Sequence, residues 1–163
     1  MTQLKHKCEK IKLLILDVDG ILTDGTFTLT EDGQEYKTFH AHDGLGVRLI
    51  QKQGVHVAVI TGRKSKAVDI RMSALGVTDI YQGQSDKTEA YEELKRKYKI
   101  KDEECAYMGD DLPDWPVMSQ VGFKITVPNA TDFIKDQADW ITTKPGGYGA
   151  VREACELITS NLQ

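Results

Sequence analysis

Cysteine is scarce and scattered in this sequence. Its three cysteines, Cys8, Cys105 and Cys155, form no C-x-x-C pair and are odd in number. This pattern argues against both a disulfide framework and a zinc site. Unpaired thiols are typical of a reducing compartment, and we therefore expect a cytoplasmic protein.

Long apolar runs and an excess of basic residues are also missing. The N-terminus, MTQLKHKCEK, is polar and precedes only a short apolar run, which predicts neither a signal peptide nor a membrane partner. The formal net charge of −4 argues against nucleic acid as a partner. Repeats and linker tracts are absent too. The 163 residues are therefore expected to form a single domain spanning 1–163.

The sequence does contain a regular alternation of strand-like and helical segments. Short apolar runs that predict strands occupy residues 12–19, 55–62, 79–83, 105–111, 122–127 and 138–142. Helical patterns lie between and after them, at residues 44–54, 64–76, 86–99, 112–122 and 149–162. This order predicts an α/β fold, a Rossmann-like doubly wound parallel sheet with helices on both faces.

Residues 26–40, TFTLTEDGQEYKTFH, interrupt that alternation after the first strand. They predict two strands around the turn Glu31-Asp32-Gly33, because Asp-Gly is a strong hairpin signal. The β-hairpin insertion is too small to be a lid domain. Its exposed Thr and Phe side chains suggest that it pairs with another subunit.

Polar side chains gather where the predicted strands end. The carboxyl ends of parallel strands form the ligand-binding edge of such a sheet. The candidates at this edge are Asp17, Asp19, Thr61, Gly62, Lys87, Asp110, Asp111 and Asp114.

Such a set suits a magnesium ion and a phosphate group. Carboxylates form an oxygen-rich site for Mg²⁺, which offsets their mutual repulsion. Thr61, nearby backbone N–H groups and Lys87 can bind phosphate oxygens, and a carboxylate can act as a nucleophile. Asp24 is better interpreted as part of the turn at Gly25.

The motifs DVDG, ITGR, a lone Lys and GDDLPD resemble, in this order, the four motifs of the haloacid dehalogenase (HAD) superfamily of phosphatases. The resemblance implies that Asp17 is the nucleophile and a metal ligand. It implies that Asp19 is the general acid/base and binds the metal through its backbone carbonyl. The remaining implied roles are phosphoryl binding by Thr61 and Lys87, metal ligation by Asp110, and support of the metal shell or of Lys87 by Asp111 and Asp114.

A narrower resemblance covers nearly the whole chain. The hairpin, HDGLGVRLI, ITGRKSKAV, GDDLPDWPVM and KPGGYGAVREACELI are similar to the 3-deoxy-D-manno-octulosonate 8-phosphate phosphatase family. This family resemblance implies a capless homotetramer that dephosphorylates a small-molecule sugar phosphate on the route to lipopolysaccharide. Hairpins would meet at the tetramer centre, and a neighbour's tail, about residues 145–163, would close each site.

The same resemblance places substrate contacts in two regions of the chain. They would fall on His40, Ala41, His42, Asp43, Gly44, Arg48, Arg63 and Arg71. Arginine suits the carboxylate of a sugar acid because it binds it in a bidentate way. Two positions differ from the family pattern, since His42 and Tyr148 stand where arginine is common.

Several alternatives remain open from the sequence. A related phosphatase would act on a nine-carbon, sialic-type sugar acid 9-phosphate. A phospho-accepting receiver module uses similar groups, but there the acidic pair precedes the phospho-accepting Asp. A non-catalytic sugar-binding subunit conflicts with the intact catalytic positions. The individual arginines and histidines could also be structural, and Asp111 and Asp114 could be an ordinary helix cap and first-turn acid.

Overall fold

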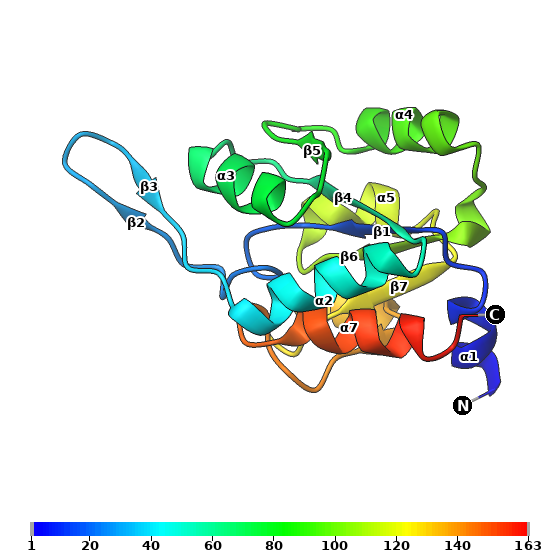
Figure 1. Ribbon diagram of the computed structural model, residues 1–163. Helices are drawn as coiled ribbons and strands as arrows, with labels where there is room; N and C mark the ends of the chain where they lie inside the picture. Colours follow the sequence, from blue (N-terminus) through cyan, green and yellow to red (C-terminus); the bar gives the residue numbers. More distant parts are fainter. Residues whose placement is uncertain (1, 163) are drawn as a thin grey trace.

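A six-stranded parallel sheet forms the centre of the computed structural model, which describes residues 2–162 (Figure 1). Its strand order is β5-β4-β1-β6-β7-β8. The strands are β1 (Leu13–Leu16), β4 (His56–Ile60), β5 (Asp79–Tyr81), β6 (Cys105–Met108), β7 (Phe123–Thr126) and β8 (Trp140–Ile141). Each lies inside a segment predicted to be a strand, and the doubly wound fold is confirmed.

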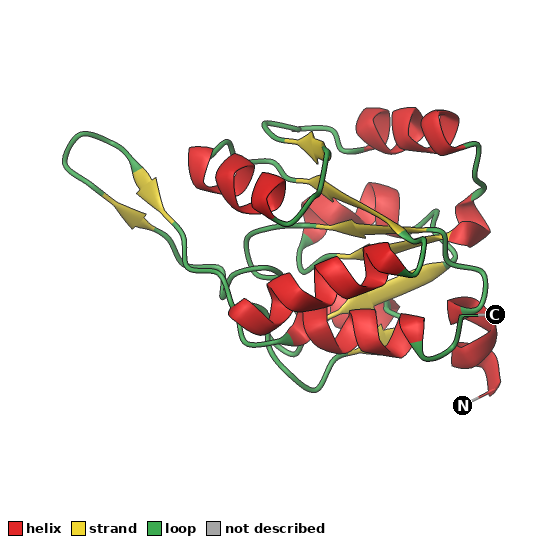
Figure 2. Ribbon diagram, viewed as in Figure 1, coloured by secondary structure: helices red, strands yellow, loops and turns green. Residues whose placement is uncertain are grey.

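Helices cover both faces of the sheet, with α2 and α7 side by side in front of it and α5 behind it (Figures 1 and 2). The α-helices are α1 (Thr2–Cys8), α2 (Ala41–Lys52), α3 (Lys66–Ala74), α4 (Thr88–Tyr98), α5 (Trp115–Met118), α6 (Asp132–Gln137) and α7 (Ala150–Thr159). Two short 3₁₀ helices are η1 (Asp102–Glu104) and η2 (Leu112–Asp114). Sequence reasoning did not predict α1 and α6, because six or seven residues are too few to show helical periodicity.

Strand β1 explains the apolar run that precedes Asp17. It pairs with β4 on one side and β6 on the other, and all four of its side chains are fully buried. A strand covered on both faces needs apolar residues at every position, which is why LLIL shows no alternation. Among residues 2–162, no helix is long and apolar enough to cross a bilayer.

The predicted hairpin is confirmed, although its strands are short. Strand β2 (Thr28–Leu29) pairs antiparallel with β3 (Glu35–Tyr36), and the hairpin extends away from the sheet (Figure 1). Phe27, Leu29 and Tyr36 expose 39%, 59% and 59% of their surface on it. The described residues contain no cap domain, in agreement with the predicted capless fold.

Candidate active site

The carboxyl ends of β1 and β6 meet at the point where the chain reverses its path across the sheet. From β1 the chain winds outward through β4 and β5, then returns to the other side of β1 as β6. Ligands of such sheets bind at this switch point. A pocket of about 340 Å³ lies here, lined by Asp17, Asp19, Gly25, Thr61, Gly62, Arg63, Lys87, Asp110, Asp111, Pro113 and Asp114. The structure thus brings together all the residues proposed for phosphoryl and metal chemistry.

Three carboxylates converge at the bottom of this pocket. Asp17, Asp110 and Asp114 each place one carboxylate oxygen within 4.8 Å of the others. Burial, together with repulsion from the neighbouring carboxylates, raises the pKa of Asp17 and of Asp110 above its ordinary value. A bound cation would offset the cost of ionising these buried carboxylates side by side. An all-oxygen donor set is the kind that Mg²⁺ prefers. The residues therefore fit a magnesium site.

Lys87 places a buried positive charge beside these carboxylates. It lies at the start of α4, is 3% exposed, and donates to Asp17 Oδ1 (3.0 Å) and Asp114 Oδ1 (2.7 Å). Burial acts to lower the pKa of Lys87, but the charges of Asp17 and Asp114 outweigh it and raise the pKa. The ammonium is therefore charged, as phosphate binding requires.

Asp114 organises the loop that follows β6. Its Oδ1 accepts hydrogen bonds from Lys87 and from the Tyr107 hydroxyl (2.7 Å). Its Oδ2 accepts from the backbone N–H groups of Asp110 (2.9 Å) and Asp111 (3.2 Å). With both oxygens engaged, Asp114 orients Lys87 and the Asp110 backbone and is more than an ordinary first-turn acid.

Two glycines let these carboxylates approach the backbone. A Cβ at Gly20, whose φ is +90°, would collide with the Asp110 carboxylate. A Cβ at Gly109 would lie 2.5 Å from Cγ of Asp114. Glycine at both positions therefore allows the motifs DVDG and GDDLPD to pack together.

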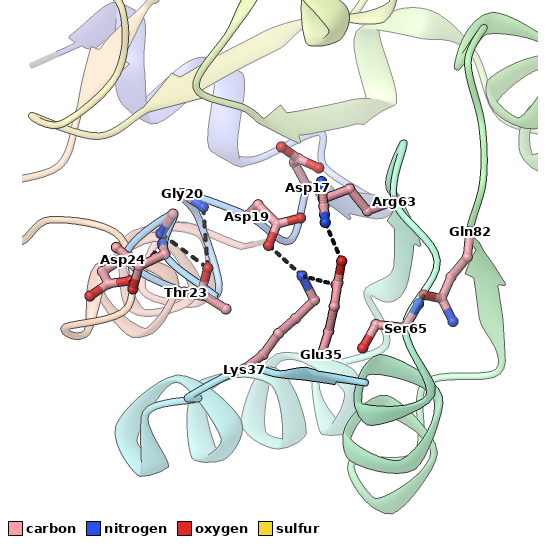
Figure 3. A network of polar contacts seen from close by, with 12 residues as sticks. Asp17, Asp19, Gly20, Thr23, Asp24, Glu35, Lys37, Arg63, Ser65 and Gln82 are labelled. Atoms are coloured by element: carbon pink, nitrogen blue, oxygen red, sulfur yellow. Dashed lines mark hydrogen bonds and ion pairs between the residues drawn. The ribbon is translucent and has the colours of Figure 1, made fainter. Parts of the chain in front are cut away.

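Two hairpin side chains, which sequence reasoning missed, contact residues that line the pocket (Figure 3). Lys37 Nζ lies 2.6 Å from Asp19 Oδ1 and 3.4 Å from Glu35 Oε2. Glu35 also pairs with Arg63, whose guanidinium lies 4.0 Å from the centre of the Phe27 ring. One sequence signal was available. Glu35 and Lys37 carry opposite charges two positions apart in a predicted strand, and such residues point to the same face.

Of the predicted substrate-contacting residues, Arg63 lines the pocket and the others do not. Arg48 donates to the Ala74 carbonyl (2.8 Å), and the Arg71 guanidinium lies against Gly44. His40 caps α2 by accepting a hydrogen bond from the backbone N–H of His42 (3.1 Å). These side chains belong to α2, its N-cap and α3, and none of them lines the pocket.

The remaining acidic candidates accept hydrogen bonds in helix caps or turns. Asp43 is buried, and its Oδ1 accepts from the backbone N–H of Arg152 (2.9 Å) in the first turn of α7. Burial raises the pKa of Asp43. Asp111 accepts from the Leu112 N–H as a cap of η2, and Asp24 accepts from Thr26 in the turn after Thr23, as interpreted from the sequence.

Comparison with known proteins identifies the family. A model of haloacid dehalogenase-like hydrolases matches residues 64–153. The 3-deoxy-D-manno-octulosonate 8-phosphate phosphatase KdsC of Escherichia coli (strain K12) is 48% identical over 152 residues, which are 93% of this chain and 81% of that protein. The chain belongs to the 3-deoxy-D-manno-octulosonate 8-phosphate phosphatase family.

Solved structures agree with this family assignment. The family member from Yersinia pestis matches with a TM-score of 0.96 at 43% identity, over 98% of this chain and 86% of that one. The Moraxella catarrhalis member, crystallised with a magnesium ion, a phosphate ion and KDO, also gives 0.96, at 46% identity over 99% and 93% of the two chains. Membership of this hydrolase family leaves the receiver-module alternative without support.

Proposed function

We propose that this chain is a magnesium-dependent phosphatase that releases phosphate from 3-deoxy-D-manno-octulosonate 8-phosphate. The observation that carries the proposal is the convergence of Asp17, Thr61 and Lys87 on one pocket, in a chain 48% identical to a phosphatase for this ester. The same relationship favours the eight-carbon substrate over the nine-carbon alternative. Such a reaction supplies the sugar acid for lipopolysaccharide synthesis.

The first half of the proposed reaction transfers the phosphoryl group to the protein. The Asp17 carboxylate attacks phosphorus, the bond from phosphorus to the sugar oxygen breaks, and Asp19 donates a proton to that oxygen. The second half reverses the role of Asp19, which takes a proton from water as the water attacks the aspartyl-phosphate. Phosphate leaves and Asp17 is regenerated.

The phosphoryl oxygens would be held by groups at the ends of β4 and the start of α4. We assign this role to the Thr61 hydroxyl, the Gly62 backbone N–H and the Lys87 ammonium. All three line the pocket, and the Lys87 contact with Asp17 places its charge beside the nucleophile. Fixed donors of this kind stabilise charge that develops during phosphoryl transfer.

We assign the magnesium ligands to the Asp17 and Asp110 carboxylates and the backbone carbonyl of Asp19. Asp111 and Asp114 would support this shell from outside, in keeping with their hydrogen bonds to the loop after β6. The ion supplies positive charge that neutralises the carboxylates and the bound phosphate.

We also propose that the enzyme acts in the cytoplasm as a homotetramer. The exposed apolar side chains of the hairpin support assembly, because a two-stranded hairpin is marginally stable alone in water. Sugar contacts are assigned to Arg63 in its own pocket. The other candidates, residues 40–44 and Arg48 in α2 and its N-cap and Arg71 in α3, would reach the substrate only where subunits meet.

A phosphate-release assay tests the proposed function. Purified protein with Mg²⁺ should release phosphate from the eight-carbon ester with a higher kcat/KM than from the nine-carbon ester. Chelation of Mg²⁺ and the Asp17→Asn variant should each reduce the rate by about 10³-fold or more. Equal rates for wild type and Asp17→Asn would overturn the proposed chemistry, whereas a preference for the nine-carbon ester would overturn only the proposed substrate.

A further inference from the structure

Lys37 is a buried lysine that reaches from the hairpin to the proposed general acid. Its side chain is 1% exposed, and Nζ lies 2.6 Å from Oδ1 of Asp19, 18 positions earlier in the chain. Figure 3 shows the Lys37 ammonium between the carboxylates of Asp19 and Glu35. Burying a lysine is costly unless its charge is paired, so the buried position of Lys37 depends on its ion pairs with Asp19 and Glu35.

Glu35, the second charge partner of Lys37, is itself held by Arg63 in the loop after β4. Glu35 Oε2 is buried without a hydrogen-bond partner and faces Lys37 Nζ at 3.4 Å. The other oxygen of Glu35 pairs with Arg63. Four side chains of alternating charge therefore connect the pocket edge at Asp19 to the pocket edge at Arg63.

Only one oxygen of the Asp19 carboxylate takes part in this network. Lys37 holds Oδ1, and within residues 2–162 no protein group donates a hydrogen bond to Oδ2. The carboxylate lies at the pocket surface with 20% of its side chain exposed. Holding Oδ1 restricts the rotation of the carboxylate, and Oδ2 is the oxygen that remains available to a bound ester.

We infer that Lys37 is a positioning residue, which orients Asp19 so that Oδ2 faces the leaving oxygen of the phosphate ester. This inference rests on the proposed phosphatase function. A catalytic group held in its reactive geometry avoids the entropic cost of finding it, and small misplacements are expensive. The hairpin thereby takes part in the chemistry of its own subunit, separately from any role in assembly.

The inference predicts which substrates depend on Lys37. A sugar alkoxide is a poor leaving group and needs the proton from Asp19 as its bond to phosphorus breaks. The 4-nitrophenolate ion is a weak base and leaves without a proton. Because kcat/KM reports steps up to formation of the aspartyl-phosphate, misorienting Asp19 should slow only the sugar ester in this parameter.

The test compares Lys37→Met and Lys37→Arg with wild type on both esters in the presence of Mg²⁺. Lys37→Met keeps the length of the side chain and removes its charge. We expect it to lower kcat/KM by about 100-fold for the sugar ester and by about 3-fold or less for 4-nitrophenyl phosphate. For the sugar ester, Lys37→Arg should have a kcat/KM about tenfold higher than that of Lys37→Met, since a guanidinium can still hold Oδ1.

Lys52→Met, on the exposed end of α2, is the matched control and should leave both reactions unchanged. Equal losses on the two esters after Lys37→Met would overturn the inference and assign Lys37 to hairpin packing. If Lys37→Met does not fold, as judged by circular dichroism, Lys37→Gln is judged by the same ratio of losses. A wild-type protein inactive on both esters would overturn the proposed function instead.

Discussion

Tyr107 lies beneath the pocket and has no contact with solvent. Its hydroxyl donates to Asp114 Oδ1 (2.7 Å) and accepts from Lys87 Nζ (3.3 Å). Burial and the adjacent Asp114 charge raise the pKa of this hydroxyl, so it stays a donor. Tyr107 thus completes the support of the carboxylate that orients Lys87, the lysine proposed to bind phosphate.

Removing this hydroxyl should impair catalysis more than it impairs folding. We expect Tyr107→Phe to lower kcat/KM about tenfold and the free energy of unfolding by about 1 kcal/mol, measured by phosphate release and urea denaturation. Tyr91→Phe is the control, because the Tyr91 hydroxyl also donates to a carboxylate, that of Asp102 (2.6 Å), away from the pocket lining. If both variants lose the same activity, Tyr107 has no special role.

Asp102 provides a prediction about pH and stability. Hydrogen bonds from Lys95 and Tyr91 lower the pKa of Asp102 in the folded state below its ordinary value of 3.8. Its stabilising effect is therefore complete above pH 3.8 and is lost as the pH falls through the lower folded-state value. Asp102→Asn should cost roughly 0.5 kcal/mol of unfolding free energy at neutral pH, because the half-exposed Asp102 is screened by solvent.

Urea denaturation between neutral pH and about pH 3 would check this prediction. The difference in unfolding free energy between wild type and Asp102→Asn should shrink toward zero as the pH falls. A difference that stays constant with pH would show that hydrogen-bond geometry, and not charge, carries the effect.

Helices α2 and α7 form a packed pair that covers one face of the sheet. Val47 and Ile50 of α2 and Ala154 and Ile158 of α7 are all fully buried. Asp43 at the start of α2 adds a polar connection by capping the first turn of α7. Because α7 belongs to the core, removing residues 145–163 would unfold the protein, and substitutions are needed to test the tail.

Two substitutions at Asp43 separate its hydrogen bond from its charge. We expect Asp43→Ala to lower the unfolding free energy by about 1–2 kcal/mol, the typical cost of losing a helix cap. Asp43→Asn should cost less, because the amide oxygen can still accept from Arg152 and no charge is buried. Urea denaturation would measure both, and equal losses would mean that the carboxylate charge itself is required.

The hairpin leaves apolar surface exposed on an otherwise compact chain (Figure 1). Leu29 and Tyr36 are each 59% exposed on opposite strands, and Phe27 adds to the same segment. Such a surface suits contact with other subunits, as proposed for the tetramer. The hairpin contacts its own chain through Lys37, which pairs with Asp19, and through Glu35, which pairs with Arg63.

Charged substitutions at the hairpin should therefore disrupt assembly without unfolding the subunit. We expect Leu29→Asp combined with Tyr36→Asp to shift the protein from the proposed tetramer to smaller species in light scattering, since burying the new charges is unfavourable. Ile141→Asp, at an apolar residue exposed outside the hairpin, is the control and should leave the mass unchanged. An unchanged mass for the hairpin double variant would contradict the proposed role.

The fold was predictable because its signals are local. Strands buried on both faces appear as short apolar runs, and the helices between them require a parallel sheet. Parallel strands bring their carboxyl ends to one edge, so the sequence also predicted that Asp17, Thr61, Lys87 and Asp110 would meet. Helices α1 and α6 escaped prediction because they are too short to show a period.

The sequence by itself determined the parallel sheet, the hairpin and the acidic edge proposed to bind phosphate, because strand ends and motif order fix them. Only the tertiary structure decided that Lys37 holds Asp19, that Tyr107 joins Asp114 in supporting Lys87, and that Asp43 caps α7. These contacts join residues far apart in the chain, and their distances depend on how the hairpin and helices pack. Local sequence patterns carry no information about such packing.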